Sequence, residues 1–183
     1  MCMPLEIRIA GYVAASFLLE REPQQWHTIL ILDSQAEATE LVSTHARSHL
    51  CLRFDDIVGP RPNHTTPTKM AIATAIAFAQ EKDKLLVCCR AGRGRSVALA
   101  YVICCQQRGV NEALRLLDPT RQRPNRLVIV LADELLDTLD VLTPFDDWRR
   151  QNAHIRLSDY EEEMEREIEA LERQGASNRI CRL

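Results

Sequence analysis

The side chain best suited to nucleophilic chemistry lies in a short loop rich in arginine and glycine. Cys89 follows an apolar run, and Arg95 stands six positions later in the stretch CRAGRGRS. Backbone N–H groups in a glycine-rich loop before a helix bind anions such as phosphate, and a guanidinium binds the same anion in a bidentate manner. The same positive charge favours the thiolate form of a cysteine. The stretch therefore predicts nucleophilic displacement at phosphorus through a phosphocysteine.

Glycine and arginine alternate in the loop that follows this cysteine. Gly92 and Gly94 permit backbone conformations that are closed to residues with a Cβ atom, so several amides can turn toward one point. The residues expected to bind the phosphoryl group are Arg90, Ala91, Gly92, Arg93 and Gly94. Two interpretations of the Arg90 and Arg93 side chains stay open: exposed charge at the rim of the loop, or contacts to a substrate with further negative charge.

The loop needs a strand before it and a helix after it. Residues 84–89 (KLLVCC) and 28–32 (TILIL) are nearly continuous in apolar residues, as in strands buried on both faces. Residues 49–54 predict a third strand, and residues 5–13 a further strand or hairpin. Helical patterns separate these runs, which indicates right-handed crossovers and a mainly parallel sheet. We expect a three-layer α/β domain with the phosphate site at the carboxyl edge of the sheet.

The predicted helices begin at recognisable caps. Ser34 and Thr66 precede two helical patterns between the strands, and Pro67 takes the first helical position of the second. After Ser96 the pattern turns helical, and a good terminator stands at Gly109. These positions place the start of a long apolar helix directly after the arginine-rich loop.

The remaining sequence divides into an apolar part and a charged part. Asn125 is predicted to cap a helix that continues to about residue 142; residues 127–131 alone also fit a strand, but the spacing of the later leucines favours the helix. Over residues 144–183 the composition becomes more charged, and Ser158 with Glu161 forms a capping box. We interpret this segment as a surface helix packed on the domain, with a partner-binding helix as the alternative.

The loop between the predicted strand and the predicted helix contains a cysteine, five residues, an arginine and a serine. This pattern resembles the signature of the cysteine-dependent protein tyrosine phosphatase superfamily. The upstream stretch RFDDI and the downstream RPN before an apolar helix are similar to the dual-specificity branch. The resemblance spans residues 28–140. It implies a phosphatase domain over residues 1–143, a C-terminal helical extension over residues 144–183, and a dual-specificity-phosphatase-like α/β fold.

The resemblance also implies roles for individual residues. Cys89 corresponds to the nucleophile, Arg95 to the residue that holds the equatorial phosphate oxygens, and Ser96 to the hydroxyl that eases departure of the thiolate. Asp56 is our choice for the general acid, which protonates the leaving oxygen and then activates water. Asp55 is the alternative general acid. No cofactor or metal ion is implied, because arginine and amide groups supply the electrostatic stabilisation.

One position departs from the family pattern. Cys88 stands where the family usually has a histidine before the nucleophile. We interpret Cys88 and Cys51 as core residues, with a redox partner of Cys89 as the alternative for either.

The implied substrate is a phosphorylated protein, above all one carrying phosphotyrosine, or another phosphomonoester. The basic loop also resembles those of phosphoinositide phosphatases, so a phosphoinositide or other polyanionic phosphate is the alternative substrate. A further alternative is a non-catalytic pseudophosphatase that binds phosphate, which the departure at Cys88 favours.

Composition restricts the other function classes. The net charge of the 183 residues is −3, which gives no overall basic field for nucleic acid. No apolar run is long enough to cross a bilayer, and the N-terminal segment lacks the basic lead-in of a signal peptide. The odd count of seven cysteines fits free thiols in the reducing cytoplasm. The sequence predicts no oligomeric state.

Overall fold

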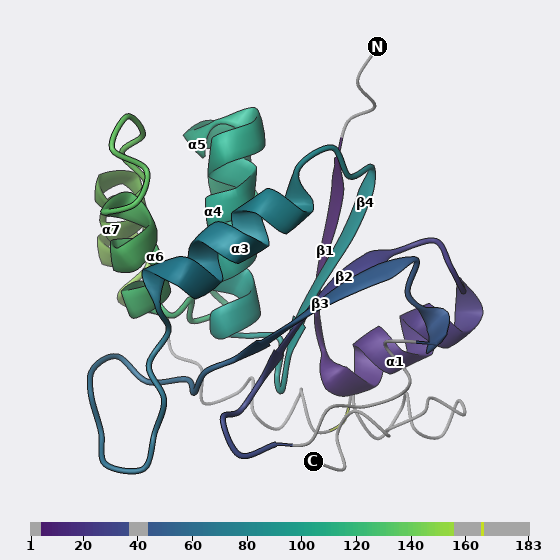
Figure 1. Cartoon of the computed structure of the whole chain (residues 1–183). Helices are drawn as coiled ribbons and strands as arrows, with labels where there is room; N and C mark the ends of the chain where they lie inside the picture. The colour runs from purple at the N-terminus through teal and green to yellow at the C-terminus, as the bar shows by residue number, and fades with distance from the viewer. Residues whose placement is uncertain (1–4, 37–43, 156–165, 167–183) are drawn as a thin grey trace.

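The computed structural model describes residues 5–36, 44–155 and Arg166. In this part of the chain, four parallel strands form one central sheet (Figure 1). Their spatial order is β1 (Glu6–Gly11), β4 (Lys84–Cys89), β2 (His27–Leu32) and β3 (Ser48–Arg53). The predicted three-layer α/β fold with a mainly parallel sheet is thereby confirmed.

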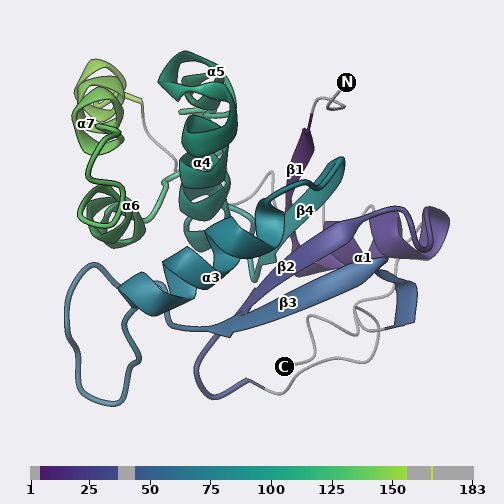
Figure 2. The ribbon, with the colours of Figure 1, turned by 45° about the horizontal axis from the view of Figure 1, so that its top comes forward.

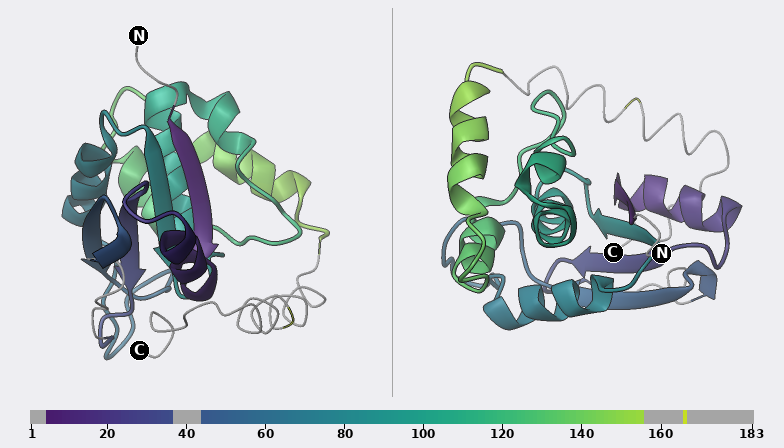
Figure 3. Two further views of the ribbon diagram at one scale, coloured as in Figure 1. Left: turned by 90° about the vertical axis from the view of Figure 1, so that its right-hand side faces the viewer. Right: turned by 90° about the horizontal axis from the view of Figure 1, so that it is seen from above.

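Helices cover both faces of the sheet (Figures 1 and 2). One face carries α1 (Tyr12–Arg21). The opposite side of the domain holds α3 (Lys69–Ala79), α4 (Arg95–Arg108), α5 (Val110–Leu114), α6 (Arg126–Asp133) and α7 (Leu142–Gln151). Seen from above in Figure 3, α4 lies between the sheet and the pair α6 and α7.

Side chains along β4 alternate between two apolar cores. Leu86 and Cys88 lie in the smaller core with Trp26, on the α1 face. Val87 and Cys89 lie in the larger core on the α4 face. Because successive side chains of a strand point to opposite faces, the two neighbouring cysteines are separated by the sheet. This alternation directs Cys89 toward the helix that follows it.

The N-terminal segment contains one strand and one helix rather than a hairpin. β1 ends at Gly11, and Tyr12 is already the first residue of α1. The Tyr12 hydroxyl donates a hydrogen bond to the carbonyl oxygen of Ile31 at 2.6 Å, and its side chain is buried. This long-range contact ties the start of the helix to β2, which the local sequence pattern could not reveal.

The helix after β3 begins later than the sequence predicts. Thr68, not Thr66, is its N-cap, and the Thr68 hydroxyl accepts a hydrogen bond from the Ala71 amide at 3.1 Å. The residues before Thr68 still belong to the preceding loop, because the Thr65 amide donates a hydrogen bond to the Asp55 carboxylate. Half of the helix predicted after Ser34, residues 37–43, falls outside the residues that the structure describes.

The helix capped by Asn125 is shorter than predicted. α6 ends at Asp133, whose carboxylate accepts hydrogen bonds from the amides of Val141 and Leu142 at 3.0 and 3.1 Å. These bonds turn the chain back and start α7. The helical interpretation of residues 127–131 is correct, whereas the extension to residue 142 is wrong.

Candidate active site

The loop predicted to bind phosphate joins the end of β4 to the first turn of α4. Cys89 is the last residue of the strand and is only 2% exposed. Its Sγ atom lies 3.1 Å from Oγ of Ser96, in the first turn of the helix. Within the described residues no side chain caps α4, so its first N–H groups lack partners in the helix. The sulfur atom therefore lies beside the positive end of a helix.

The shape of the loop depends on Gly92, whose φ is +69°. A Cβ atom at this position would lie 2.4 Å from the backbone nitrogen of Gly11 and 2.6 Å from the carbonyl carbon of Ala10. The loop thus packs against the end of β1, backbone on backbone. The Tyr12 amide also donates to the Arg90 carbonyl oxygen at 3.3 Å. Only glycine allows the two backbones to come this close, which explains why the loop needs a glycine at position 92.

Arg95 is the first residue of the helix that follows the loop and is buried, with 3% of its surface exposed. Its Nη1 atom donates to the carbonyl oxygen of Phe54 and pairs with Asp33 Oδ1, each at 2.8 Å. Within the described residues, the buried Nε atom has no hydrogen-bond acceptor. A buried donor without a partner costs about 1–3 kcal/mol. An oxyanion bound by the loop is a suitable acceptor for this N–H group.

The two neighbouring aspartates have different surroundings. Asp55 is buried, and its carboxylate accepts hydrogen bonds from the Ser34 amide at 3.0 Å, the Ser34 hydroxyl at 2.7 Å and the Thr65 amide at 2.7 Å. Burial alone would raise the pKa of Asp55. The hydrogen bonds from Ser34 and Thr65 and the nearby His64 outweigh burial and lower this pKa to about 2. Asp55 therefore connects two loops as a permanent carboxylate.

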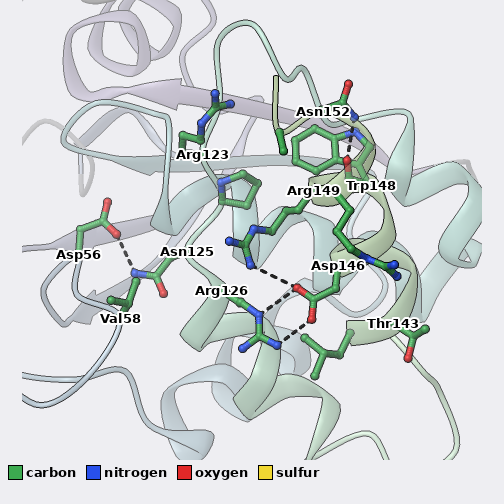
Figure 4. A pocket seen from close by; sticks show the side chains of 14 residues that line it. Asp56, Val58, Arg123, Asn125, Arg126, Thr143, Asp146, Trp148, Arg149 and Asn152 are labelled. Atoms are coloured by element: carbon green, nitrogen blue, oxygen red, sulfur yellow. Dashed lines mark hydrogen bonds and ion pairs between the residues drawn. The ribbon is translucent and has the colours of Figure 1, made fainter. Parts of the chain in front are cut away.

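Asp56 is exposed and lies against the phosphate-binding loop. A Cβ atom added to Gly94 would lie 2.3 Å from Oδ2 of Asp56, so the carboxylate occupies the space that a side chain at Gly94 would take. Oδ1 of Asp56 accepts a hydrogen bond from Nδ2 of Asn125 at 2.7 Å (Figure 4). One carboxylate oxygen is thus fixed by Asn125 and the other faces the loop.

Asn125 joins three parts of the site, and its role there was missed in the sequence. Its Oδ1 caps α6, as predicted, by accepting from the amides of Leu127 and Val128. Its Nδ2 donates to Asp56 and its own amide donates to the Gly94 carbonyl oxygen at 3.2 Å. The sequence carries the capping signal alone, because the other two contacts connect residues far apart in the chain.

Asp33 is the second residue that the sequence analysis missed. It directly follows β2, the strand beside β4. Because the carboxyl ends of parallel strands meet at one edge of the sheet, an acid at this position was the available signal. Its ion pair holds the guanidinium of Arg95 in the orientation that leaves Nε without an acceptor.

The cysteines considered as redox partners lie away from the site. Cys88 is fully buried in the α1-side core, on the opposite face from Cys89. Cys51 lies in β3, which is separated from β4 by β2. Neither forms a disulfide bond within the described residues. Neither sulfur atom therefore lies next to the sulfur of Cys89.

The remaining residues of the loop differ in exposure. Arg90 is exposed at the rim, whereas Ala91, Gly92 and Arg93 are half-buried and Gly94 is buried. Among the described residues, no group of three or more His, Cys, Asp or Glu side chains is arranged to hold a metal ion. The helices in the described ranges are all too short or too polar to span a membrane.

Comparison with known proteins identifies the fold. No protein-family model and no curated protein sequence matches the chain. Among solved structures, PTPMT1 in complex with PI(5)P superposes with a TM-score of 0.51 at 13% identity, over 72% of this chain and 90% of that one.

Two further structures match with TM-scores just below that value. The Yvh1 phosphatase domain from Chaetomium thermophilum has a TM-score of 0.49 at 17% identity and covers 72% of this chain and 90% of its own. Human DUSP28 has a TM-score of 0.48 at 16% identity and covers 73% and 91%. The superposition on PTPMT1 extends the resemblance seen in the loop sequence to the arrangement of the sheet and its helices. The chain has the fold of the dual-specificity type of protein tyrosine phosphatase.

Proposed function

We propose that the protein is a phosphomonoester hydrolase that works through a phosphocysteine at Cys89, most of all on phosphotyrosine in proteins. The observation that carries this proposal is the buried, unpaired Nε of Arg95, below the loop that begins at Cys89. A buried cation with a free donor, beside a thiol at a helix N-terminus, provides binding and attack at the same place.

In the first step, the thiolate of Cys89 attacks phosphorus. The new S–P bond forms as the bond from phosphorus to the ester oxygen breaks. Arg95 and the loop amides bind the three other phosphoryl oxygens, whose charge grows in the transition state. The protonated carboxyl of Asp56 transfers its proton to the leaving oxygen, which departs as a phenol or an alcohol.

In the second step, water cleaves the phosphocysteine. The carboxylate of Asp56 takes a proton from water, and the water oxygen attacks phosphorus. The S–P bond breaks, and its electron pair returns to Cys89 as a thiolate while inorganic phosphate leaves. Ser96 Oγ, 3.1 Å from Sγ, donates a hydrogen bond to the departing sulfur.

The assignment of Asp56 rather than Asp55 follows from their contacts. The low pKa of Asp55 keeps its carboxyl group ionised, and its oxygens already accept three hydrogen bonds from Ser34 and Thr65. Asp56 keeps one oxygen toward the loop at Gly94. Hydrolysis of a phosphotyrosine peptide by Asp56→Asn should fall about a hundredfold or more, the usual contribution of a general acid. Hydrolysis of p-nitrophenyl phosphate should fall less, because p-nitrophenolate needs less help from a proton.

A matched pair of cysteine variants tests the nucleophile. Cys89→Ser should lose turnover of p-nitrophenyl phosphate by about three orders of magnitude or more. Cys51→Ser, which changes an exposed thiol on β3, should keep wild-type turnover. If the wild type is as inert as Cys89→Ser and still binds a phosphotyrosine peptide, the pseudophosphatase alternative is correct.

A phosphoinositide is the second candidate substrate. The exposed Arg90 at the rim of the loop favours it, and PTPMT1, of similar fold, was crystallised with PI(5)P. Arg93→Ala should reduce turnover of a soluble inositol phosphate far more than turnover of a phosphotyrosine peptide if the phosphoinositide is the substrate. Equal losses on both substrates favour the phosphoprotein.

We further propose that the enzyme works in the cytoplasm and without a metal ion. None of the described cysteines forms a disulfide bond, which fits a reducing compartment: Cys51, Cys88, Cys89, Cys104 and Cys105. Because Arg95 and the loop amides supply the positive field, turnover in excess EDTA should equal turnover in its absence. Loss of turnover in EDTA, restored by a divalent cation, would refute metal independence.

A further inference from the structure

A broad cleft adjoins the candidate active site. It lies between the loop after β3, the segment before α6, and helix α7, and its volume is about 870 Å³ (Figure 4). Asp56 and Asn125 belong to both the cleft and the site. The volume is within the range of about 300–1,000 Å³ that is typical of ligand-binding pockets. A substrate whose phosphate lies in the loop would therefore continue across Asp56 into this cleft.

Positive charge predominates along the cleft. Its lining includes the four arginines Arg123, Arg126, Arg149 and Arg150, against two carboxylates, Asp56 and Asp146, and Arg150 is paired with Asp147 of the same helix. Asp146 is shared by two of these arginines. Arg126 bonds it through Nε at 2.9 Å and through Nη2 at 2.7 Å, and Arg149 Nη1 lies 3.3 Å from it. The cluster of Arg126, Asp146 and Arg149 thus keeps a net positive charge.

Arg123 adds a further positive charge at the end of the cleft nearest the loop. Its Nη1 donates to the carbonyl oxygen of Pro119 at 2.8 Å, and its Nη2 to that of Ile155 at 2.6 Å. Carbonyl oxygens orient a guanidinium without neutralising its charge. The Arg123 amide donates to the Arg93 carbonyl oxygen at 3.0 Å, so the charge is fixed beside the phosphate-binding loop.

Apolar surface is interspersed with these charges. Val58 is 73% exposed, and Pro124, Leu142 and Trp148 also line the cleft. Trp148 stacks on the buried ring of Phe145, with the ring centroids 6.0 Å apart. Arginines beside an aromatic and aliphatic surface are the features that protein interfaces use to bind peptides. The cleft combines arginines with apolar surface, and it adjoins the candidate active site at Asp56 and Asn125.

We propose that this cleft binds the acidic residues that flank the phosphorylated residue of a protein substrate. The proposal rests on the phosphatase function proposed above and specifies its substrate class. Carboxylates of the substrate pair with the cluster of Arg126, Asp146 and Arg149 and with Arg123, while its apolar side chains contact Trp148 and Val58. Arg149 is the specificity-determining residue that can be changed most selectively, because Asp146 keeps its bidentate partner Arg126.

The test compares two phosphotyrosine peptides that differ only in their flanks, glutamate in one and glutamine in the other. The full-length wild type should hydrolyse the glutamate peptide with a kcat/KM about fivefold higher, the size expected for several partly exposed charge pairs. Arg149→Glu should abolish this preference and leave p-nitrophenyl phosphate turnover unchanged. Arg115→Glu, which changes an exposed arginine directly after α5 and outside the cleft, should keep the preference. About 1 M salt should also remove it.

A binding measurement separates the failure of this inference from failure of the proposed function. Cys89→Ser, titrated with both peptides, should bind the glutamate peptide more tightly even if the wild type hydrolyses nothing. Equal affinity and equal kcat/KM for the two peptides would overturn the inference while leaving the phosphatase function intact.

Two other occupants would give different results, and either would overturn the inference. If Arg149→Glu weakens binding to phosphatidylcholine vesicles that contain a phosphatidylinositol phosphate, and leaves the peptide preference unchanged, the cleft serves a lipid surface. If Arg149→Glu raises turnover of both peptides equally, the acidic residues 158–172 of this chain occupy the cleft.

Discussion

Adjacent residues with the same side chain have different surroundings at this site. Asp55 is buried among donors from Ser34 and Thr65, and Asp56 is exposed beside Gly94. The position of Asp55 also matters for Arg95, because Ser34 follows Asp33, the partner of that arginine. A single buried carboxylate therefore fixes the loop that orients the guanidinium proposed to bind phosphate.

Stability should depend on the charge of Asp55. The pKa of this carboxyl falls from 3.8 to about 2 in the folded protein, which corresponds to about 2 kcal/mol of stabilisation at neutral pH. Asp55→Asn should lower the free energy of unfolding by about that amount, measured by urea denaturation. Because the folded pKa is depressed, the stabilisation is complete above pH 3.8 and is lost as the pH falls toward 2.

The difference between wild type and Asp55→Asn should therefore shrink in acid. A difference that stays constant from neutral pH down to pH 2 would show that the carboxylate charge plays no part. Asp56→Asn is the matched control, since its exposed side chain should change stability by less than about 0.5 kcal/mol.

The sequence alone could not separate the two aspartates. Both lie in the same short stretch after a predicted strand, and either could have been the general acid. The contacts that distinguish them come from Ser34, Thr65 and Asn125, which are distant in sequence. Cys89, Arg95 and Ser96, in contrast, lie within one strand–loop–helix unit, so the sequence predicts their proximity.

At the scale of elements, the unit β4–loop–α4 depends on its contact with β1. Gly92 and Gly11 bring the two backbones together, and the sulfur of Cys89 and the hydroxyl of Ser96 meet beneath the loop. Backbone packing therefore contributes directly to the shape of the loop.

Gly92→Ala should disrupt this packing. The new Cβ would clash with the backbone of Gly11, and a positive φ costs a non-glycine residue about 1–3 kcal/mol. Displacement of the loop should lower kcat/KM on the order of a hundredfold. Gly109→Ala is the control: its φ is +90°, but nothing lies within 4 Å of the added Cβ. It should lose some stability and keep turnover, and equal losses in both variants would contradict a steric role for Gly92.

Elements with strong local patterns were predicted well. The strand at residues 84–89 agrees with β4, because a continuous apolar run reflects burial on both faces. α1 was missed, since Tyr12 leads directly from strand to helix and is held by the distant Ile31. α6 was overextended because the turn after Asp133 depends on its side chain accepting amides from residues 141 and 142.

At the scale of the whole molecule, α7 links the core to the cleft. Phe145 is fully buried and its ring lies 5.8 Å from that of Tyr101 in α4, while Trp148 on the same helix lines the cleft. The division proposed from the sequence, a phosphatase domain to residue 143 and a C-terminal extension from residue 144, falls inside this helix. The residues after Ile155, except Arg166, lie outside those that the structure describes.

Phe145→Ala should therefore destabilise the domain as a whole. Removing a fully buried phenylalanine ring costs about 3–5 kcal/mol, which urea denaturation would measure. Met70→Ala, at a side chain that is 75% exposed, should change stability by less than about 0.5 kcal/mol. A loss below about 1 kcal/mol for Phe145→Ala would instead indicate that α7 folds apart from the rest of the domain.

The central claim is that the thiolate of Cys89 takes the phosphoryl group from the substrate. Full-length Asp56→Asn, which should hydrolyse the intermediate slowly, is mixed with ³²P-labelled p-nitrophenyl phosphate, whose leaving group needs less help from a proton, and quenched in acid. Fragment masses of the digested protein should place the label on the sulfur of Cys89, and Cys89→Ser should carry none. Label on another residue, or hydrolysis by the wild type that persists in Cys89→Ser, would contradict the account.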